Sequence, residues 1–65
     1  MNDFYGFLME FTNGTTPRKE HLVRRYSEEK IQESLEKGYI KEFAETSEGE
    51  IMYIITSFGK EIRNK

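Results

Sequence analysis

Apolar side chains recur at helical spacing at the start of the chain. Four of them occupy positions i, i+3, i+4 and i+7, which form one face of a helix: Phe4, Phe7, Leu8 and Phe11. We expect Asn2 or Asp3 to cap this helix and Asn13-Gly14 to end it. The aromatic face is predicted to lie in the core. The alternative is a dimer face, with Tyr5 and Met9 on the opposite side of the helix.

A second helix is predicted after a short polar loop. Pro17 would occupy its first position, where a missing backbone N–H costs no hydrogen bond. The helix would then run through residues 18–26. Leu22, Val23 and Tyr26 would form a small inner face, with most of the basic residues outside.

A third helix follows almost at once. Ser27 is a suitable N-cap, and Ile31, Ser34 and Leu35 mark the buried side. Gly38 is expected to end the helix, because glycine tolerates the left-handed backbone at that position. The short connection to the second helix resembles the tight turn of a helix-turn-helix.

The period of the pattern then changes to that of strands. Residues 39–45 alternate between the two sides, and residues 51–55 are rich in β-branched and aromatic side chains. The polar stretch 46–50 between them predicts a hairpin turn. Thr56 is then placed to cap a last short helix. The predicted fold class is therefore α+β: three helices, a β-hairpin and a short C-terminal helix.

Length and composition narrow the class of protein. A chain of 65 residues is expected to form a single domain, residues 1–65, with a small core. It has no cysteine for a disulfide or a thiolate metal site, so five Phe and four Tyr must supply much of the buried area. No apolar run approaches the ~20 residues that a membrane helix needs. No secretion signal is present at the N-terminus. We therefore expect a soluble cytoplasmic protein without a membrane segment.

Two motifs carry a resemblance to a known class. Residues 35–40 read LEKGYI and residues 53–61 read YIITSFGKE, with a charged hairpin between them. This order resembles the winged helix-turn-helix regulators of the MarR and PadR families and the small prophage proteins of the YjcQ type, over about residues 31–62. The resemblance implies a winged helix that binds DNA, with the third helix in the major groove. The wing, residues 46–50, would touch the backbone or the minor groove.

The charge pattern departs from that resemblance. The base-reading positions that it implies are mostly acidic: Glu28, Glu29, Lys30, Gln32 and Glu33. Residues 27–37 carry two basic and four acidic side chains, a net charge of −2. Residues 38–55 carry one basic and four acidic side chains, a net charge of −3. Phosphates repel acidic side chains, so a DNA contact would need positive charge from elsewhere.

Positive charge is concentrated in two other segments. Residues 17–26 carry four basic side chains against one acidic, a net charge of +3, and residues 56–65 carry three against one, a net charge of +2. The residues predicted to contact DNA are Arg18, Lys19, Arg24, Arg25, Lys30, Gln32, Lys60 and Arg63. The alternative is that these are ordinary solvated charges that pair with nearby glutamates.

Two functions follow, and they belong to different classes. The usual use of the scaffold favours a small transcriptional regulator of phage or prophage type that binds double-stranded DNA. The alternative is a protein–protein interaction module whose acidic third helix and wing bind a basic protein surface. A homodimer is a further possibility, formed by the first helix or by the outer side of strand 51–55.

Residue types suited to catalysis are sparse. His21 is the only histidine, and no Cys/His or Asp/His cluster has the spacing of zinc ligands. No glycine-rich phosphate loop occurs, and the paired glutamates lie in exposed, polar contexts. We therefore expect a non-enzymatic protein with no catalytic residue, metal, cofactor or small-molecule substrate.

Overall fold

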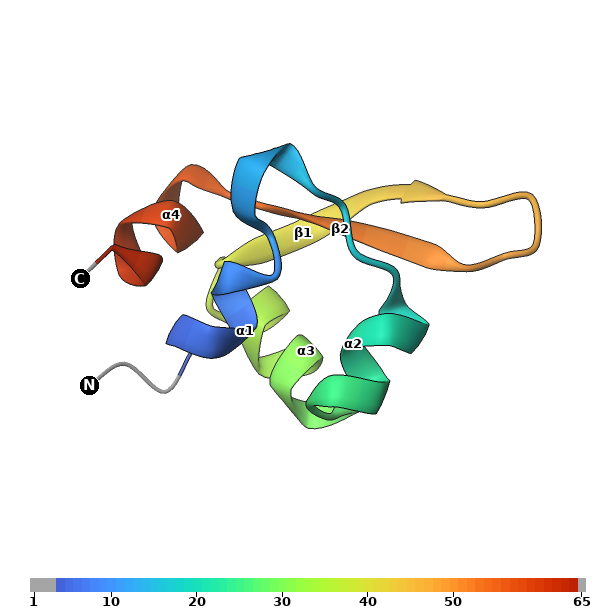
Figure 1. The fold of residues 1–65 in the computed structure, drawn as a ribbon, viewed down its shortest axis with the longest axis horizontal. Coiled ribbons are helices and arrows are strands. Elements are labelled where there is room, and N and C mark those ends of the chain that lie inside the picture. The colour runs from blue at the N-terminus through green and yellow to red at the C-terminus, as the bar shows by residue number, and fades with distance from the viewer. Residues whose placement is uncertain (1–3, 65) are drawn as a thin grey trace.

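The structure, a computed structural model, describes residues 4–64 (Figure 1). The α+β fold predicted from the sequence is confirmed, and the elements follow the predicted order: α1 (Tyr5–Met9), the 3-10 helix η1 (Thr12–Gly14), α2 (Lys19–Arg25), α3 (Glu28–Glu36), β1 (Ile40–Glu45), β2 (Ile51–Ile55) and α4 (Ser57–Arg63).

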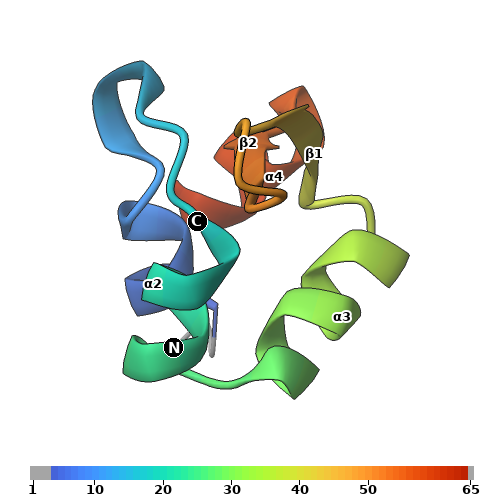
Figure 2. The same cartoon turned by 90° about the vertical axis from the view of Figure 1, so that its right-hand side faces the viewer.

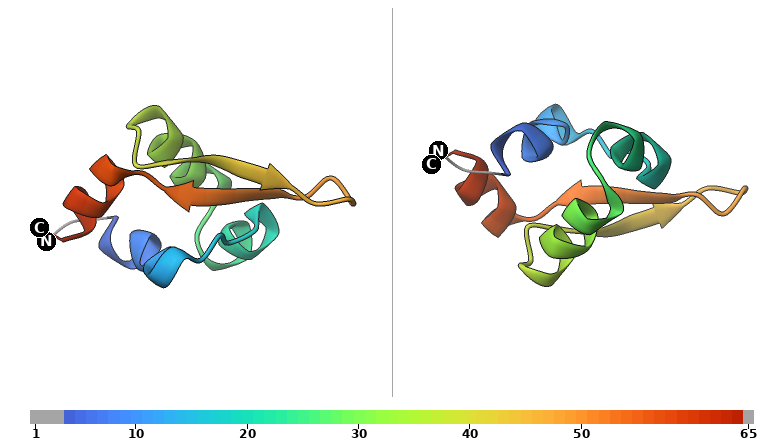
Figure 3. Two further views of the ribbon diagram at one scale, coloured as in Figure 1. Left: turned by 90° about the horizontal axis from the view of Figure 1, so that it is seen from above. Right: turned by 90° about the horizontal axis from the view of Figure 1, so that it is seen from below.

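The hairpin lies along one side of the helices and extends beyond them. Viewed from the hairpin tip, α2 and α3 lie next to each other with the hairpin above (Figure 2). From above, the hairpin runs between α3 on one side and α1 and α2 on the other (Figure 3). α4 packs against α1 at the end opposite the tip. The molecule is 36 Å long and 20 Å across, so its two ends present separate surfaces.

The aromatic face of the first helix lies in the core, as predicted. Its four apolar side chains are at most 8% exposed: Phe4, Phe7, Leu8 and Phe11. The α-helix ends earlier than expected, at Met9, and η1 continues the chain to Gly14. Asn13 has a φ of 62° in this turn, which asparagine tolerates better than most residues. The predicted caps Asn2 and Asp3 lie outside the described residues.

The prediction for Pro17 was wrong. α2 begins at Lys19, and Pro17 lies in the extended segment before it. The Pro17 carbonyl oxygen accepts a hydrogen bond from the Tyr53 N–H at 3.1 Å, and Arg18 forms an isolated antiparallel bridge with Met52. This segment is therefore held against β2 by an isolated bridge, outside the two-stranded sheet. The contact with β2 fixes the extended backbone, so the helix starts two residues later.

The inner face of α2 is narrower than predicted. Leu22 is fully buried and Tyr26 is half-buried, but Val23 is 40% exposed. Adjacent residues of a helix point about 100° apart, since one turn takes 3.6 residues. The positions i and i+4 therefore face the core together, and the residue next to Leu22 turns toward solvent.

Both ends of α3 are built as the sequence predicted. The Ser27 hydroxyl accepts a hydrogen bond from the Lys30 N–H at 3.2 Å and caps the start of the helix. Gly38 has a φ of 78°, and its N–H donates to the Leu35 carbonyl. The Tyr39 N–H donates to the Ser34 carbonyl at 2.9 Å. These two bonds form a Schellman motif, which turns the chain from the helix into β1.

The predicted hairpin is confirmed, with one irregularity. Ile40 pairs with Ile55 at its base, and Glu45 pairs with Ile51 near the turn. The register shifts between Glu42 and Ala44, so that an extra residue, Phe43, has no cross-strand partner. A β-bulge of this kind twists the strand and redirects the side chains at that point.

Thr56 joins three elements at the base of the hairpin. Its hydroxyl accepts a hydrogen bond from the Gly59 N–H at 2.9 Å and so caps α4, as predicted. The same hydroxyl donates to the Gly38 carbonyl oxygen at 2.6 Å, with the Tyr39 carbonyl oxygen 3.0 Å away. Gly59 lies so close to this crossing that a Cβ atom on it would collide with the Tyr39 carbonyl group.

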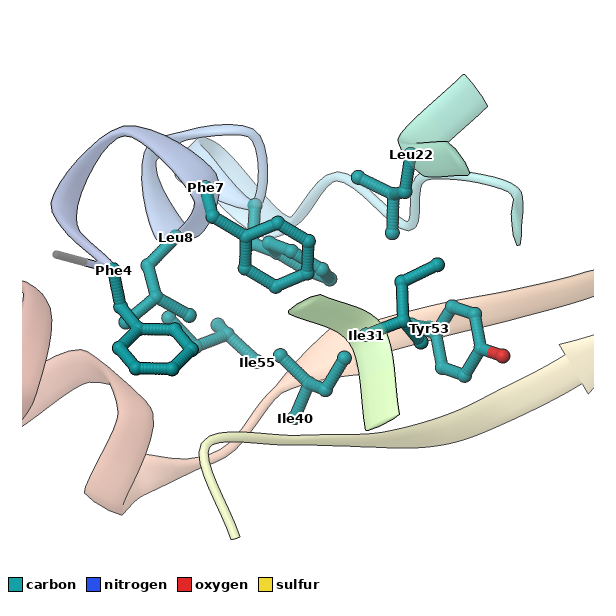
Figure 4. Close-up of a cluster of buried hydrophobic side chains, with 9 residues drawn as sticks. Phe4, Phe7, Leu8, Leu22, Ile31, Ile40, Tyr53 and Ile55 are labelled. Carbon is teal, nitrogen blue, oxygen red and sulfur yellow. The ribbon is translucent and has the colours of Figure 1, made fainter. Parts of the chain in front are cut away.

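The core forms where the helices meet the inner face of the hairpin (Figure 4). Leu22 and Ile31 contribute from α2 and α3, and Ile40 and Tyr53 contribute from the two strands. Of these, only Tyr53 carries a polar group. Burial raises the pKa of its hydroxyl above 10.0. Every element except η1 therefore depends on the same small cluster, which positions the surfaces described next.

Candidate functional site

The residues predicted to bind DNA do not form one surface. Lys60 and Arg63 lie on α4, at the end of the molecule opposite the hairpin tip (Figure 1). Arg18, Lys19, Arg24 and Arg25 lie on or next to α2, nearer the tip. Lys30 and Gln32 lie on α3. The structure thus brings the four basic residues around α2 together and separates them from the basic end of α4.

Three of the four basic residues around α2 are paired with carboxylates. Lys19 Nζ lies 3.3 Å from Glu28 Oε1, Arg24 Nη2 lies 2.7 Å from Glu20 Oε1, and Arg25 Nε lies 3.2 Å from Glu10 Oε2. The hydrogen bond to Glu28 raises the pKa of Lys19, and the negative charge of that carboxylate adds to the effect. Among residues 4–64, no carboxylate lies within ion-pair distance of Arg18.

A fourth carboxylate reaches α2 from the hairpin. Glu50 Oε1 accepts a hydrogen bond from the Glu20 backbone N–H at 2.6 Å. Three glutamates from other elements, Glu10, Glu28 and Glu50, therefore contact the segment that carries a net charge of +3 by its sequence. Their three negative charges reduce its net charge to zero. Contacts with these carboxylates therefore offset the positive charge of the segment.

Glu10 organises a polar cluster between α1 and α2. His21 Nε2 lies 3.0 Å from Glu10 Oε1, and the Tyr26 hydroxyl donates to Glu10 Oε2 at 3.2 Å. The hydrogen bond from His21 lowers the pKa of Glu10, with further contributions from Tyr26 and Arg25. Burial raises the pKa of Tyr26. The Tyr26 hydroxyl also contacts the Gly6 carbonyl oxygen at 2.9 Å, so the cluster ties the two helices together.

The two predicted base-reading residues of α3 differ in their surroundings. Lys30 Nζ lies 4.4 Å from the centre of the Phe4 ring, and the edge of that ring meets Tyr39. A cation over an aromatic face is attracted by about 0.5–1 kcal/mol at an exposed site. Lys30 is therefore held against α1. Gln32 is exposed and lies among acidic neighbours.

The exposed face of α3 is acidic. Four of its five exposed residues are glutamates, Glu28, Glu29, Glu33 and Glu36, and the fifth is Gln32. Glu29 and Glu33 are one turn apart, so their carboxylates lie on the same side of the helix. This is the face that the sequence resemblance implied would point toward DNA. Here it presents negative charge, and only Glu28 has a basic partner within the described residues.

The hairpin continues the acidic surface. Glu42, Glu45 and Glu48 are exposed along β1 and the turn, with Lys41 as their basic neighbour. Phe43 is 58% exposed among them. The sequence did not single out Phe43, because strand alternation alone does not reveal a bulge. The exposed residues of α3 and of the hairpin are thus both predominantly acidic.

The end of the molecule at α1 and α4 has a different character. A depression of about 420 Å³ is lined there by Tyr5, Met9, Thr12, Arg63 and Asn64. Tyr5 is 50% exposed and Met9 is 41% exposed, so the face considered for a dimer is open to solvent. Self-association through this face stays a prediction.

The described residues hold no arrangement suited to a metal ion, since no group of three or more His, Asp or Glu is clustered for binding. Within the same part of the chain, no helix has the length and apolar character needed to cross a membrane. Comparison with protein families, curated proteins and solved structures finds no match for this chain. The class that the structure itself defines is a small α+β protein with the shape of a winged helix.

Proposed function

We propose that this protein, which has the shape of a winged helix, binds a basic protein surface through the acidic face of α3 and the adjoining hairpin. The proposal depends on which charged side chains have a partner of opposite charge within the molecule. Three of the four basic residues around α2 are paired with Glu10, Glu20 and Glu28, whereas most of the glutamates on the exposed face of α3 have no basic partner among the described residues. Charge left unpaired on a surface attracts partners of opposite sign.

The proposal is tested by charge reversal with a matched control. Glu33→Lys alters the acidic face of α3, and Glu61→Lys makes the same change on α4, where Glu61 is also exposed. We expect immobilised protein to capture a basic partner from the native host. Glu33→Lys would abolish that capture and Glu61→Lys would leave it unchanged. The proposal fails if both variants retain the same partners as the unmodified protein.

Binding to double-stranded DNA is a second candidate, supported by the winged-helix shape and by Arg18, which has no carboxylate partner among residues 4–64. An electrophoretic mobility shift at two salt concentrations tests it, because each phosphate contact makes the affinity fall as salt rises. Arg18→Ala and Arg24→Ala would weaken such binding. Strong, salt-dependent binding to duplex DNA would favour this candidate over the acidic-face proposal.

A further inference from the structure

Phe43 is an exposed aromatic side chain on the hairpin. It is 58% exposed, more than any other large apolar residue that the structure describes. The bulge between Glu42 and Ala44 leaves it without a cross-strand partner. Burial of a phenylalanine contributes about 1.5–3 kcal/mol, so this ring contributes far less to folding than a core ring does. Its large exposed face is available to a binding partner.

The surroundings of Phe43 define what that partner must carry. The ring lines a depression of about 310 Å³ together with Glu42, Ala44, Glu45 and Ile51. Two glutamates therefore border the same depression as three apolar residues. Anions would be repelled here, and a purely apolar group would leave no partner for the two carboxylates. A planar cation matches both features, because it can stack on the ring and donate hydrogen bonds to carboxylates at its edge.

We infer that the depression around Phe43 receives an arginine side chain from a basic protein segment, with the guanidinium stacked on the Phe43 ring and hydrogen-bonded to Glu42 or Glu45. This inference rests on the proposed function and specifies the chemistry of the partner. Arginine fits better than lysine, since its guanidinium is flat, more weakly hydrated and carries five donors in a fixed plane. The Lys30 ammonium over Phe4 shows the related contact inside the same molecule.

The test uses the whole protein and two labelled peptides, one that alternates Arg and Ser and one that alternates Lys and Ser. Fluorescence anisotropy measures their affinities at low salt. We expect the Arg peptide to bind more tightly than the Lys peptide. Phe43→Ala should weaken the Arg peptide about threefold, in line with an exposed cation–π contact. Phe58→Ala is the control, because Phe58 is 47% exposed but lies on α4.

Two further variants separate stacking from other contributions. Phe43→Leu keeps an apolar side chain but removes the aromatic face, so it should weaken Arg-peptide binding as Phe43→Ala does. Glu42→Gln combined with Glu45→Gln should remove the preference for the Arg peptide. Circular dichroism on each variant confirms that the fold is retained. Equal binding by Phe43→Leu and the unmodified protein would overturn the inference.

The outcomes distinguish this inference from the function on which it rests. If Glu33→Lys abolishes peptide binding and Phe43→Ala has no effect, the docking point at Phe43 is wrong and the acidic-face proposal stands. If neither peptide binds the unmodified protein, both proposals are wrong. If binding falls with Phe43→Ala and Phe43→Leu but not with Phe58→Ala, the inference is supported.

Discussion

The carboxylate of Glu50 accepts a hydrogen bond from the backbone N–H of Glu20 at 2.6 Å, across a separation of 30 positions. Glu50 stands where the hairpin turn enters β2, and Glu20 lies in the first turn of α2. The residue that precedes α2 does not cap it, since the Arg18 side chain makes no capping bond. The hairpin therefore caps a helix that is distant in the sequence.

We predict that Glu50→Ala lowers the free energy of unfolding by about 1 kcal/mol, the usual loss when a helix N-cap is removed. Urea denaturation followed by circular dichroism measures the change. Glu48→Ala is the matched control, because Glu48 is an exposed glutamate in the same turn. Equal stability of the two variants would show that the contact to Glu20 contributes nothing.

Gly59 is predicted to tolerate no side chain. A Cβ atom there would lie 2.8 Å from Ile55 Cγ1 and would collide with the Tyr39 carbonyl group, which belongs to the backbone and cannot move aside easily. Gly59→Ala should therefore destabilise the fold by about 3 kcal/mol or prevent folding, as expected for severe overpacking. Thermal unfolding measures the effect.

Gly6→Ala provides the contrast for that experiment. A Cβ atom at Gly6 would meet only the Tyr26 hydroxyl oxygen, at 3.9 Å, which is an ordinary contact. Since Gly6 lies inside α1, alanine should stabilise the helix by up to about 1 kcal/mol. A loss of stability in Gly6→Ala as large as that in Gly59→Ala would contradict the packing argument.

Ser34 offers a stabilising substitution. Its side chain is fully buried in α3, and its hydroxyl oxygen has no hydrogen-bond partner within the described structure. Burial of an unpaired hydroxyl is unfavourable, and alanine has the higher helix propensity. Ser34→Ala should raise the free energy of unfolding by about 1 kcal/mol in urea denaturation. A clear loss of stability would mean that the hydroxyl has a partner after all.

Acid should destabilise the protein in part through Glu10. The pKa of Glu10 in the folded protein lies below its ordinary value of 4.5, chiefly because His21 donates a hydrogen bond to its carboxylate. Folding therefore favours the ionised form. Its contribution to stability is present above pH 4.5 and is lost as the pH falls through the lower pKa of the folded state.

The measurement is the free energy of unfolding between neutral and acidic pH for the unmodified protein and for Glu10→Gln. We expect the variant to lose less stability than the unmodified protein below pH 4.5, since glutamine does not titrate in this range. Glu61→Gln on the surface of α4 is the control. Identical pH profiles for Glu10→Gln and the unmodified protein would contradict the assigned role of the cluster.

The fold was predictable where local signals decide it. Gly38 and Thr56 act through their own backbone and side chain, and both perform the predicted roles at the ends of the hairpin. The start of α2 was not predictable in this way, because the hydrogen bond that Pro17 accepts from Tyr53 and the bridge between Arg18 and Met52 hold the preceding segment extended. The bulge at Phe43 depends likewise on strand pairing rather than on the order of residues.

The charge of the candidate site was harder to predict from the sequence than the fold was. The order of residues shows a basic segment around α2. It does not show that the carboxylates of Glu10, Glu28 and Glu50, which lie outside that segment, contact it in the folded state. The acidic character of α3, in contrast, follows from its own sequence, and the structure leaves most of that face exposed. The net charge of a surface segment therefore depends on which charged side chains from other elements contact it in the folded protein.

The hydroxyl group of Thr56 has a consequence for folding. It donates to the Gly38 carbonyl oxygen after α3, lies close to the Tyr39 carbonyl oxygen before β1, and accepts from the Gly59 N–H in the first turn of α4. Because one side chain links these three junctions, each contact favours the others, and we expect the second half of the molecule to fold and unfold cooperatively. Under load or heat, the hairpin would then separate from its base together with α4 rather than peel away strand by strand.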